Sequence, residues 1–192
     1  MMKKSILSTL VLAGIVSAPA MATNVETFMG GGVGYQLDNF KDAAKMHSED
    51  ASYQIRGGVI VDNHHRLMAT YGYKKDKFNM VEPGEETIKA KHKQDLFLVS
   101  YDYLVPVTSN INLFAGASMG AAHNKLTAKT SEASGKDSST DFVWGGQLGA
   151  MVQLTDNISS DLTYRYLDQN YKIDGVRLKG TEQVVWSVDY KF

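Results

Sequence analysis

The chain has 192 residues, 20 basic and 21 acidic side chains, a formal net charge of −1 and no cysteine. This charge balance provides no electrostatic footprint for nucleic acid. The absence of cysteine excludes a disulfide scaffold and a thiolate metal site.

The first 22 residues have the composition of a secretory signal peptide. Two lysines stand near the start, residues 6–16 form an apolar run, and a small-x-small cleavage site ends at Ala22. The run is too short to cross a bilayer as a helix, which argues against the competing interpretation as a membrane anchor. We therefore expect residues 1–22 to be removed. Residues 23–192 then form one mature domain with 18 basic and 21 acidic residues.

Eight segments of the expected mature chain alternate apolar and polar residues with the period of two that a half-buried strand requires. No apolar run is long enough for a transmembrane helix, so only a β-barrel would carry this chain across a membrane. We expect the apolar face of each segment to be free of charge, because a lysine facing lipid at the midplane costs roughly 2–4 kcal/mol. The segments are residues 28–37, 52–61, 66–74, 93–105, 111–122, 140–154, 157–167 and 181–192.

The connections between these segments alternate strictly between long and short. Long, charged connections cover residues 38–50, 75–92, 125–139 and 168–180. Short ones cover residues 62–65, 106–110 and 156–157. Long loops on one side and tight turns on the other are typical of outer-membrane barrels with both termini in the periplasm. The pattern predicts an all-β fold, an eight-stranded antiparallel up-and-down transmembrane β-barrel.

The polar face of the segments carries charge that would point into the barrel. Eight strands enclose a lumen that side chains fill or that holds one small ligand. Buried charges must be paired or hydrated, so we expect a salt-bridge network. It would place Arg66 near Asp102, and Asp161 and Arg165 near Asp189 and Lys191. The expected network consists of Arg56, Arg66, Asp102, Asp161, Arg165, Asp189 and Lys191.

Two interpretations of the lumen stay open at this point. We favour a polar plug that sets the register of the barrel, because the barrel is narrow. The alternative is a narrow or gated conduit. Small residues on the inward face would leave room for either; they are Gly30, Gly32, Gly34, Gly116, Gly120, Gly145 and Gly149.

Aromatic residues on the apolar face collect toward the strand ends. Amphipathic rings favour the headgroup level of a membrane, so two bands are expected of a membrane barrel. The expected outer band contains Tyr35, Tyr53, Tyr73, Phe142, Trp144 and Tyr166, with Trp186 nearer the outer leaflet. The expected periplasmic band contains Tyr101, Tyr103, Tyr190 and Phe192.

The histidines offer weak candidates for chemistry. His47, Ser48 and Glu49 stand together in the first long connection, and His123 ends the fifth segment. Neither place has a pattern that orients a nucleophile and a base, so we expect no catalytic residue. His64 and His65 are adjacent, and adjacent residues of an extended chain point to opposite faces, which makes a poor metal pair. We expect neither a metal nor a cofactor.

The second long connection is locally basic. Lys74, Lys75 and Lys77 precede its acidic centre, and Lys89, Lys91 and Lys93 follow that centre. One interpretation is contact with anionic lipopolysaccharide or host glycans, and the other is a solvated charged loop.

The last residues carry the most specific pattern of the chain. Val184, Trp186, Val188 and Tyr190 alternate with polar residues, and the chain stops on Phe192. Together with the glycine-rich opening strand at residues 28–35 and the alternating loops, this terminus resembles the small eight-stranded outer-membrane barrels. That superfamily includes the OmpA transmembrane domain, OmpX and the opacity-type surface proteins.

The resemblance implies a monomeric barrel in a Gram-negative outer membrane, whose terminal strand, ending at Phe192, is recognised by the insertion machinery. No peptidoglycan-binding domain is expected after the barrel. The expected function is a role of the surface loops in envelope structure or adhesion, with lipopolysaccharide, outer-membrane lipids and host surface ligands as partners. The alternatives are a narrow porin-like channel for small solutes and a lipid A-modifying enzyme.

Overall fold

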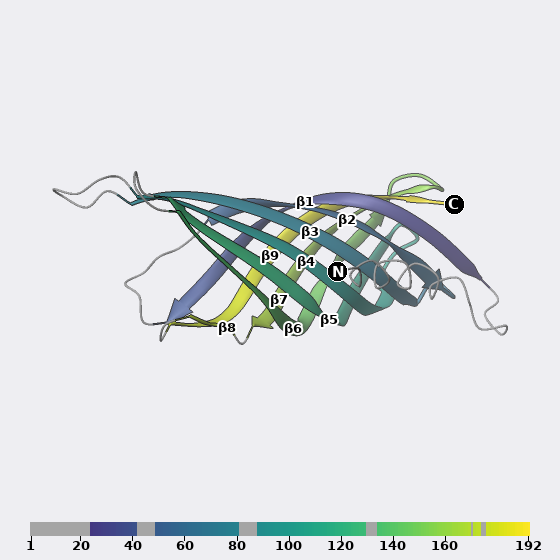
Figure 1. Ribbon diagram of the computed structural model, residues 1–192. Coiled ribbons are helices and arrows are strands. Elements are labelled where there is room, and N and C mark those ends of the chain that lie inside the picture. Colours follow the sequence, from purple (N-terminus) through teal and green to yellow (C-terminus); the bar gives the residue numbers. More distant parts are fainter. Residues whose placement is uncertain (1–23, 42–48, 81–87, 130–133, 170, 174–175) are drawn as a thin grey trace, which may run out of the picture.

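The alternating segments form long antiparallel strands that follow one another around a closed barrel, as the computed structural model shows (Figure 1). The backbone is described for residues 24–41, 49–80, 88–129, 134–169, 171–173 and 176–192. In these ranges no helix is long and apolar enough to cross a membrane. The strands are β1 (Val25–Lys41), β2 (Glu49–Val61), β3 (His65–Met80), β4 (Ile88–Pro106), β5 (Ile111–Lys129), β6 (Ser134–Gln153), β7 (Ile158–Gln169), β8 (Tyr171–Ile173) and β9 (Val176–Lys191).

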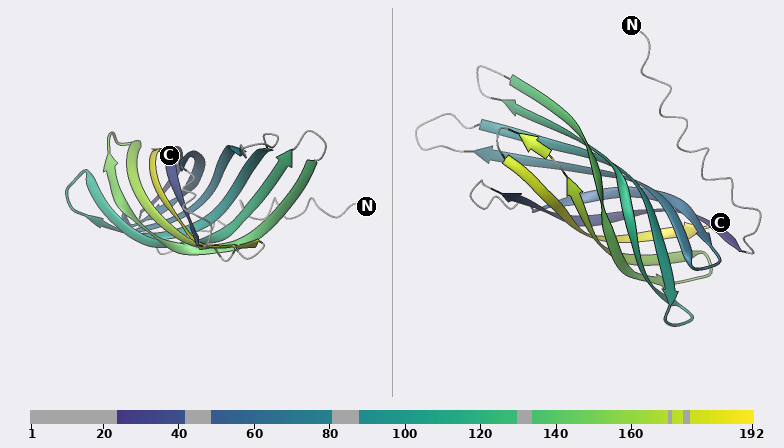
Figure 2. Two further views of the ribbon diagram at one scale, coloured as in Figure 1. Left: turned by 90° about the vertical axis from the view of Figure 1, so that its left-hand side faces the viewer. Right: turned by 90° about the horizontal axis from the view of Figure 1, so that it is seen from below.

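The barrel closes because β1 pairs with β2 on one edge and with β9 on the other. The three-residue strand β8 pairs with the start of β9. That part of β9 already bonds β1 on its other edge, so β8 continues the line of β7. β7 and β8 together make one barrel strand, and the predicted eight-stranded antiparallel barrel is confirmed. Its strands cross the molecule obliquely (Figure 2).

The two ends of the barrel differ in their connections. We name as the turn end the end with the short connections at residues 62–64, 107–110 and 154–157. Asp62 and Asn63 adopt positive φ angles of 50° and 59° there, which short polar Asp and Asn tolerate better than most residues. The chain finishes at the same end, where the Phe192 amide donates to the Thr27 carbonyl at 2.9 Å. The opposite end is the loop end.

The strands run further toward the loop end than the sequence pattern predicted. β4 and β6 begin at Ile88 and Ser134, where we expected long connections, and β5 continues to Lys129. The expected boundaries were wrong because alternating hydrophobicity is required only where one face meets an apolar medium. Beyond it, backbone pairing alone continues a strand.

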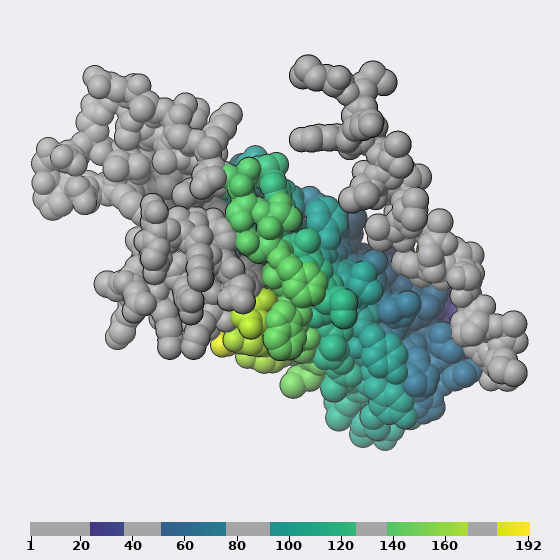
Figure 3. Space-filling view, turned by 60° about the horizontal axis from the view of Figure 1, so that its bottom comes forward, coloured from purple at the N-terminus to yellow at the C-terminus, as the bar shows by residue number. Residues whose placement is uncertain are grey.

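Polarity is inverted relative to a water-soluble protein. Ile55 is 65% exposed on the outer face, whereas its neighbour Arg56 is 3% exposed inside the barrel. The same alternation holds along the other strands, so large apolar side chains form the outer wall. Such a surface is the form a barrel takes when lipid solvates it. Figure 3 shows part of the outer surface, on which neighbouring strands lie side by side.

The outer wall is not free of charge, contrary to our expectation. Lys93 and Asp95 share the outward face of β4 with Phe97. The Tyr71 hydroxyl donates to the Asp95 carboxylate at 2.7 Å, which satisfies one of its oxygens. Both residues lie in the half of β4 that is nearer the loop end.

The space beside the inward glycines is filled by neighbouring strands and by lumen side chains, such as that of Asp189 beside Gly30. A Cβ atom on Gly120 would overlap the backbone carbonyl of Phe97, and one on Gly145 would overlap that of Tyr166. The glycines therefore let neighbouring strands approach at a tightly curved wall.

We predict that Gly145→Ala lowers the free energy of unfolding by about 1–3 kcal/mol, because the added methyl group is forced against backbone. Gly146→Ala is the matched control, since its Cβ would lie 3.6 Å from the Gly116 carbonyl oxygen, an ordinary contact. Urea titration in micelles measures both. Equal stability of the two variants would contradict the close approach.

Candidate functional site

Five charged side chains from five strands meet inside the barrel, and we call them the ionic cluster: Arg56, Arg66, Asp102, Asp161 and Asp189. Arg56 Nη2 lies 2.6 Å from both Asp161 Oδ2 and Asp189 Oδ2. Arg66 Nη1 lies 2.9 Å from Asp161 Oδ2, and its Nη2 lies 2.8 Å from Asp102 Oδ2. All five residues are buried. Asp161 is thus shared by two guanidinium groups, and the cluster joins facing walls.

The polar contacts continue from the ionic cluster toward the loop end. Gln147 Nε2 donates to Asp102 Oδ1 at 2.6 Å, and Gln147 Oε1 accepts from Arg165 Nε at 2.8 Å. Arg165 Nη1 donates to Gln183 Oε1 at 3.4 Å. Arg165 is buried, so its guanidinium group needs hydrogen-bond partners inside the barrel. The amide oxygens of Gln147 and Gln183 supply two of them.

Further amides extend this chain. Gln183 Nε2 donates to Gln36 Oε1 at 2.7 Å, and Gln36 Nε2 donates to Gln94 Oε1 at 3.2 Å. Gln94 Nε2 donates to Asn124 Oδ1 at 3.0 Å. These amides were not among the residues expected in the lumen network, although their inward positions follow from the period of two in their strands. A cavity of about 10 Å³ beside Gln36 and Gln94 has room for about one water molecule.

Apolar side chains fill the lumen on the other side of the ionic cluster. Leu104, Phe114 and Met151 form one buried cluster. The Arg66 guanidinium carbon lies 4.3 Å from the centroid of the Phe114 ring, so the ionic cluster stacks directly on these side chains. Phe28, Ile60 and Met68 form a second cluster.

A vestibule of about 590 Å³ occupies the turn end of the barrel. Glu26, His64 and Lys191 are among the polar residues that line it, and Lys191 Nζ lies 3.0 Å from Glu26 Oε2. Its apolar lining includes Leu104 and Met151 of the buried clusters. The vestibule therefore meets the apolar filling of the lumen at its inner side.

Not all the charged residues that we expected to pair do so. Arg66 lies directly across from Asp102 and bonds to it. Asp161 and Asp189 both bond Arg56, whereas Arg165 bonds Gln147 and Gln183, and Lys191 pairs with Glu26. Register places Asp161 opposite Ser187 and Arg165 opposite Gln183, so neither faces a group of opposite charge on β9. Gly30 stands in register between Arg56 and Asp189, so the arginine side chain reaches the carboxylate across a residue without a side chain.

Every expected membrane-facing aromatic residue lies on the outer face. Tyr190 and Phe192 meet edge to face at the turn end, with ring centroids 5.3 Å apart. Trp186 Nε1 donates to Ser160 Oγ at 2.9 Å, so its polar atom is bonded on the apolar wall. The outward set contains Tyr35, Tyr53, Tyr73, Tyr101, Tyr103, Phe142, Trp144, Tyr166, Trp186 and Tyr190.

The histidines do not assemble a catalytic arrangement among the described residues. His47 and Ser48 lie outside them. His123 Nδ1 lies 2.7 Å from Thr140 Oγ1 on the outer wall, and Asp95 pairs with His123 on the neighbouring strand. The Asp95 carboxylate, however, accepts its hydrogen bond from Tyr71. Thr140, His123 and Asp95 thus lie close together, but Asp95 bonds Tyr71 and does not orient the His123 ring as a base.

Metal-binding geometry is likewise not found in the part of the chain that the structure describes. His64 lines the vestibule, with Nδ1 2.6 Å from the Asp62 carbonyl oxygen. His65 instead bonds the Tyr101 hydroxyl on the outer wall at 2.7 Å. Both rings lie near Tyr103, with centroids 6.0 Å and 5.4 Å from that of the tyrosine.

The neighbouring lysines of β3 and β4 are divided between the inner and outer faces of the barrel. Lys74, the last residue of the expected third segment, is buried in the barrel, 2% exposed. Lys75 and Lys93 are exposed on the outer face. The difference follows from strand continuation, because alternation sends successive lysines to opposite sides.

We predict that Arg56→Leu destabilises the barrel by about 3–5 kcal/mol, because it leaves the Asp189 carboxylate and part of Asp161 buried without a cation. The control Lys191→Leu breaks the partly exposed pair with Glu26 and should cost less than about 1 kcal/mol. Urea unfolding of folded protein in micelles compares them, and equal losses would rule out a structural role for the cluster.

The comparisons with solved structures agree with this architecture. Ail, the attachment invasion locus protein of Yersinia pestis, superimposes with a TM-score of 0.63 at 14% identity, over 88% of this chain and 99% of Ail. Neisserial surface protein A gives 0.63 at 16% identity, over 88% and 99%. Outer membrane protein H of Pseudomonas aeruginosa gives 0.55 at 24% identity, over 87% and 99%. At these identities the likeness concerns the fold.

No curated protein matches the sequence. A family model does match, namely the outer membrane protein beta-barrel domain, over residues 8–192. The match spans nearly the whole chain, including every strand of the closed barrel and the terminal Phe192. The protein is thus a bacterial outer-membrane β-barrel, and the chain belongs to the outer membrane protein beta-barrel domain family.

Proposed function

We propose that this protein is a barrel with a closed lumen that acts at its outer side, in envelope structure or adhesion. The observation that carries the proposal is the filling of the lumen. Phe114 and its apolar neighbours, the ionic cluster and the amide chain follow one another between the vestibule and the loop end. A solute would have to displace buried, paired charges to pass.

The proposed orientation places the turn end in the periplasm and the loop end outside the cell. Outer-membrane barrels have short turns on the periplasmic side and longer connections outside, and the turn end carries the short connections of this chain. The outward aromatic residues, from Tyr73 near the loop end to Tyr190 at the turn end, would then mark the two membrane interfaces. Removal of residues 1–22 as a signal peptide belongs to the same proposal.

Strand pairing that continues toward the loop end supports a role for the outer side. β3 pairs with β4 as far as Met80 and Ile88, and β5 with β6 as far as Lys129 and Ser134. These ribbons would present a folded surface above the membrane. The structure of Ail in complex with the heparin analogue sucrose octasulfate is in line with such a surface contacting a polyanion.

We predict that the purified protein gives no steady conductance in planar bilayers. The double variant Arg66→Ala/Phe114→Ala, which removes the stacked contact between the ionic and apolar layers, should raise the current. A steady, large conductance of the unmodified protein would overturn the closed lumen and support the narrow porin-like channel instead.

We predict that shortening the outer ribbons reduces binding of cells to host surfaces without loss of the barrel. Replacing residues 76–91 by a tight turn removes the β3–β4 ribbon, and replacing residues 127–136 removes the β5–β6 ribbon. Adhesion of bacteria that carry each variant is measured against unmodified cells. If both deletions leave adhesion unchanged, while the protein still shifts on unheated gels, adhesion through these ribbons is wrong.

A further inference from the structure

Three lysines form a row across neighbouring strands of the outer wall. Lys75 of β3 lies directly opposite Lys93 of β4, which lies directly opposite Lys125 of β5. All three are exposed on the face that also carries Tyr73. Neighbouring strands are about 4.8 Å apart, so three like charges stand within about 10 Å. We call Lys75, Lys93 and Lys125 the lysine row.

None of the described residues relieves the repulsion within this row. Like charges at directly opposite positions of a sheet oppose strand pairing. Among the described residues, no carboxylate forms an ion pair with any of the three lysines. Asp95 is the nearest acid along β4, and it accepts its hydrogen bond from Tyr71, on the side away from the row. An anion from outside the protein would relieve the repulsion.

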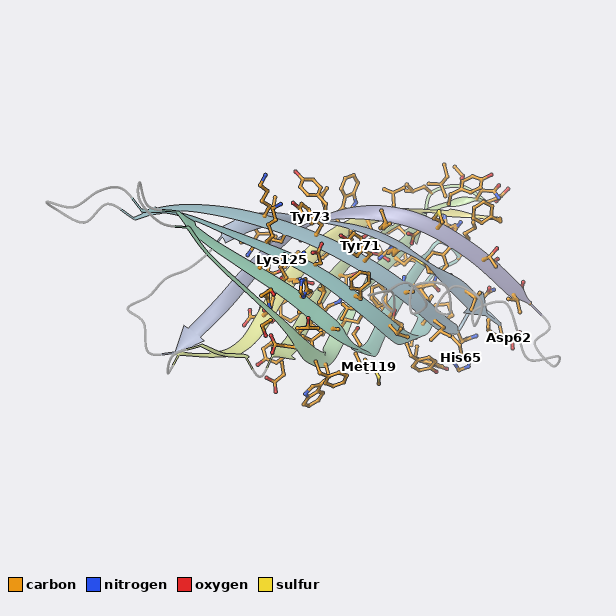
Figure 4. All side chains as sticks on the ribbon, in the orientation of Figure 1. Asp62, His65, Tyr71, Tyr73, Met119 and Lys125 are labelled. Atoms are coloured by element: carbon orange, nitrogen blue, oxygen red, sulfur yellow. The ribbon has the colours of Figure 1, made fainter. Side chains whose placement is uncertain are left out.

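The lysine row stands where the apolar wall ends. Lys75 is two residues beyond Tyr73, or about 7 Å along the strand, and Phe97 lies further toward the turn end. Figure 4 shows Tyr73 and Lys125 away from the turn end, which carries Asp62 and His65. An ammonium group at this height would meet the headgroups of the surrounding lipid.

The backbone register continues the pattern beyond the row. Lys77 pairs with Lys91, and Lys89 pairs with Lys129. Each of these positions is an even number of residues from Lys75, Lys93 or Lys125 on the same strand. The sequence thus repeats lysine at every second position in this region of β3 and β4. A scattered surface charge would not have this period.

We propose that the lysine row binds the phosphate groups of lipopolysaccharide in the outer leaflet. Lysine serves as a compact point charge for phosphate, and each lysine at an anionic membrane surface contributes to binding. The lipid would approach the wall from the side, with its acyl chains on the apolar surface around Phe97. The inference rests on the orientation proposed above but not on the closed lumen.

The test is a triple variant, Lys75→Gln/Lys93→Gln/Lys125→Gln, folded in zwitterionic micelles and titrated with bisphosphorylated lipid A. We expect its affinity to fall on the order of 100-fold relative to the unmodified protein. The matched control, Lys41→Gln/Lys172→Gln/Lys179→Gln, removes the same charge from β1, β8 and β9. It should retain most of the affinity. Gel mobility without heating verifies that both variants fold.

Dephosphorylated lipid A should bind the unmodified protein as weakly as bisphosphorylated lipid A binds the triple variant. Equal losses in the two triple variants, or no loss in the first, would overturn the proposal. A parallel titration with heparin tests whether the lysine row binds an anionic glycan instead. If the lysine row proves necessary for heparin but not for lipid A, it is a glycan site and the proposal is wrong. Because conductance tests the lumen separately, failure of one proposal leaves the other standing.

Discussion

The architecture depends on one constraint, which is that no backbone amide or carbonyl remains unpaired inside a lipid bilayer. The pairing of β1 with β9 removes the last free edge of the sheet. Once the barrel is closed, alternation along each strand assigns every residue to lipid or lumen. A slip of one residue between β1 and β2 would exchange Ile55 and Arg56 between these environments, so polarity and register determine each other.

Closure also explains the contents of the lumen. Tight curvature brings strands so close that Gly120 and Gly145 have no space for a Cβ atom. It also brings carboxylates of β7 and β9 within reach of Arg56, with Gly30 in register between Arg56 and Asp189. Inside such a space a charge without a partner would be strongly unfavourable, and the ionic cluster meets that requirement by sharing Asp161 between two cations.

The residues of the outer wall change along the barrel. Large apolar side chains cover most of it, whereas Asp95 and the lysine row lie toward the loop end. The structural relatives share this barrel at 14–24% identity, so the fold tolerates wide change as long as alternation and closure persist.

Much of this protein follows from local pattern alone. The period of two, the spacing of turns and the terminal Phe192 were enough to predict the barrel and the inward position of the ionic cluster, because alternation is a property of neighbours along the chain. The charges of Lys93 and Asp95 on the outer wall were not predicted. Strand ends near Ile88 and Ser134 were not predictable in this way, since pairing in water leaves no hydrophobic signal. The partners of Asp161, Arg165 and Lys191 depended on distances across the lumen. Such distances exist only when eight strands close, which is a property of the folded barrel and of no single segment.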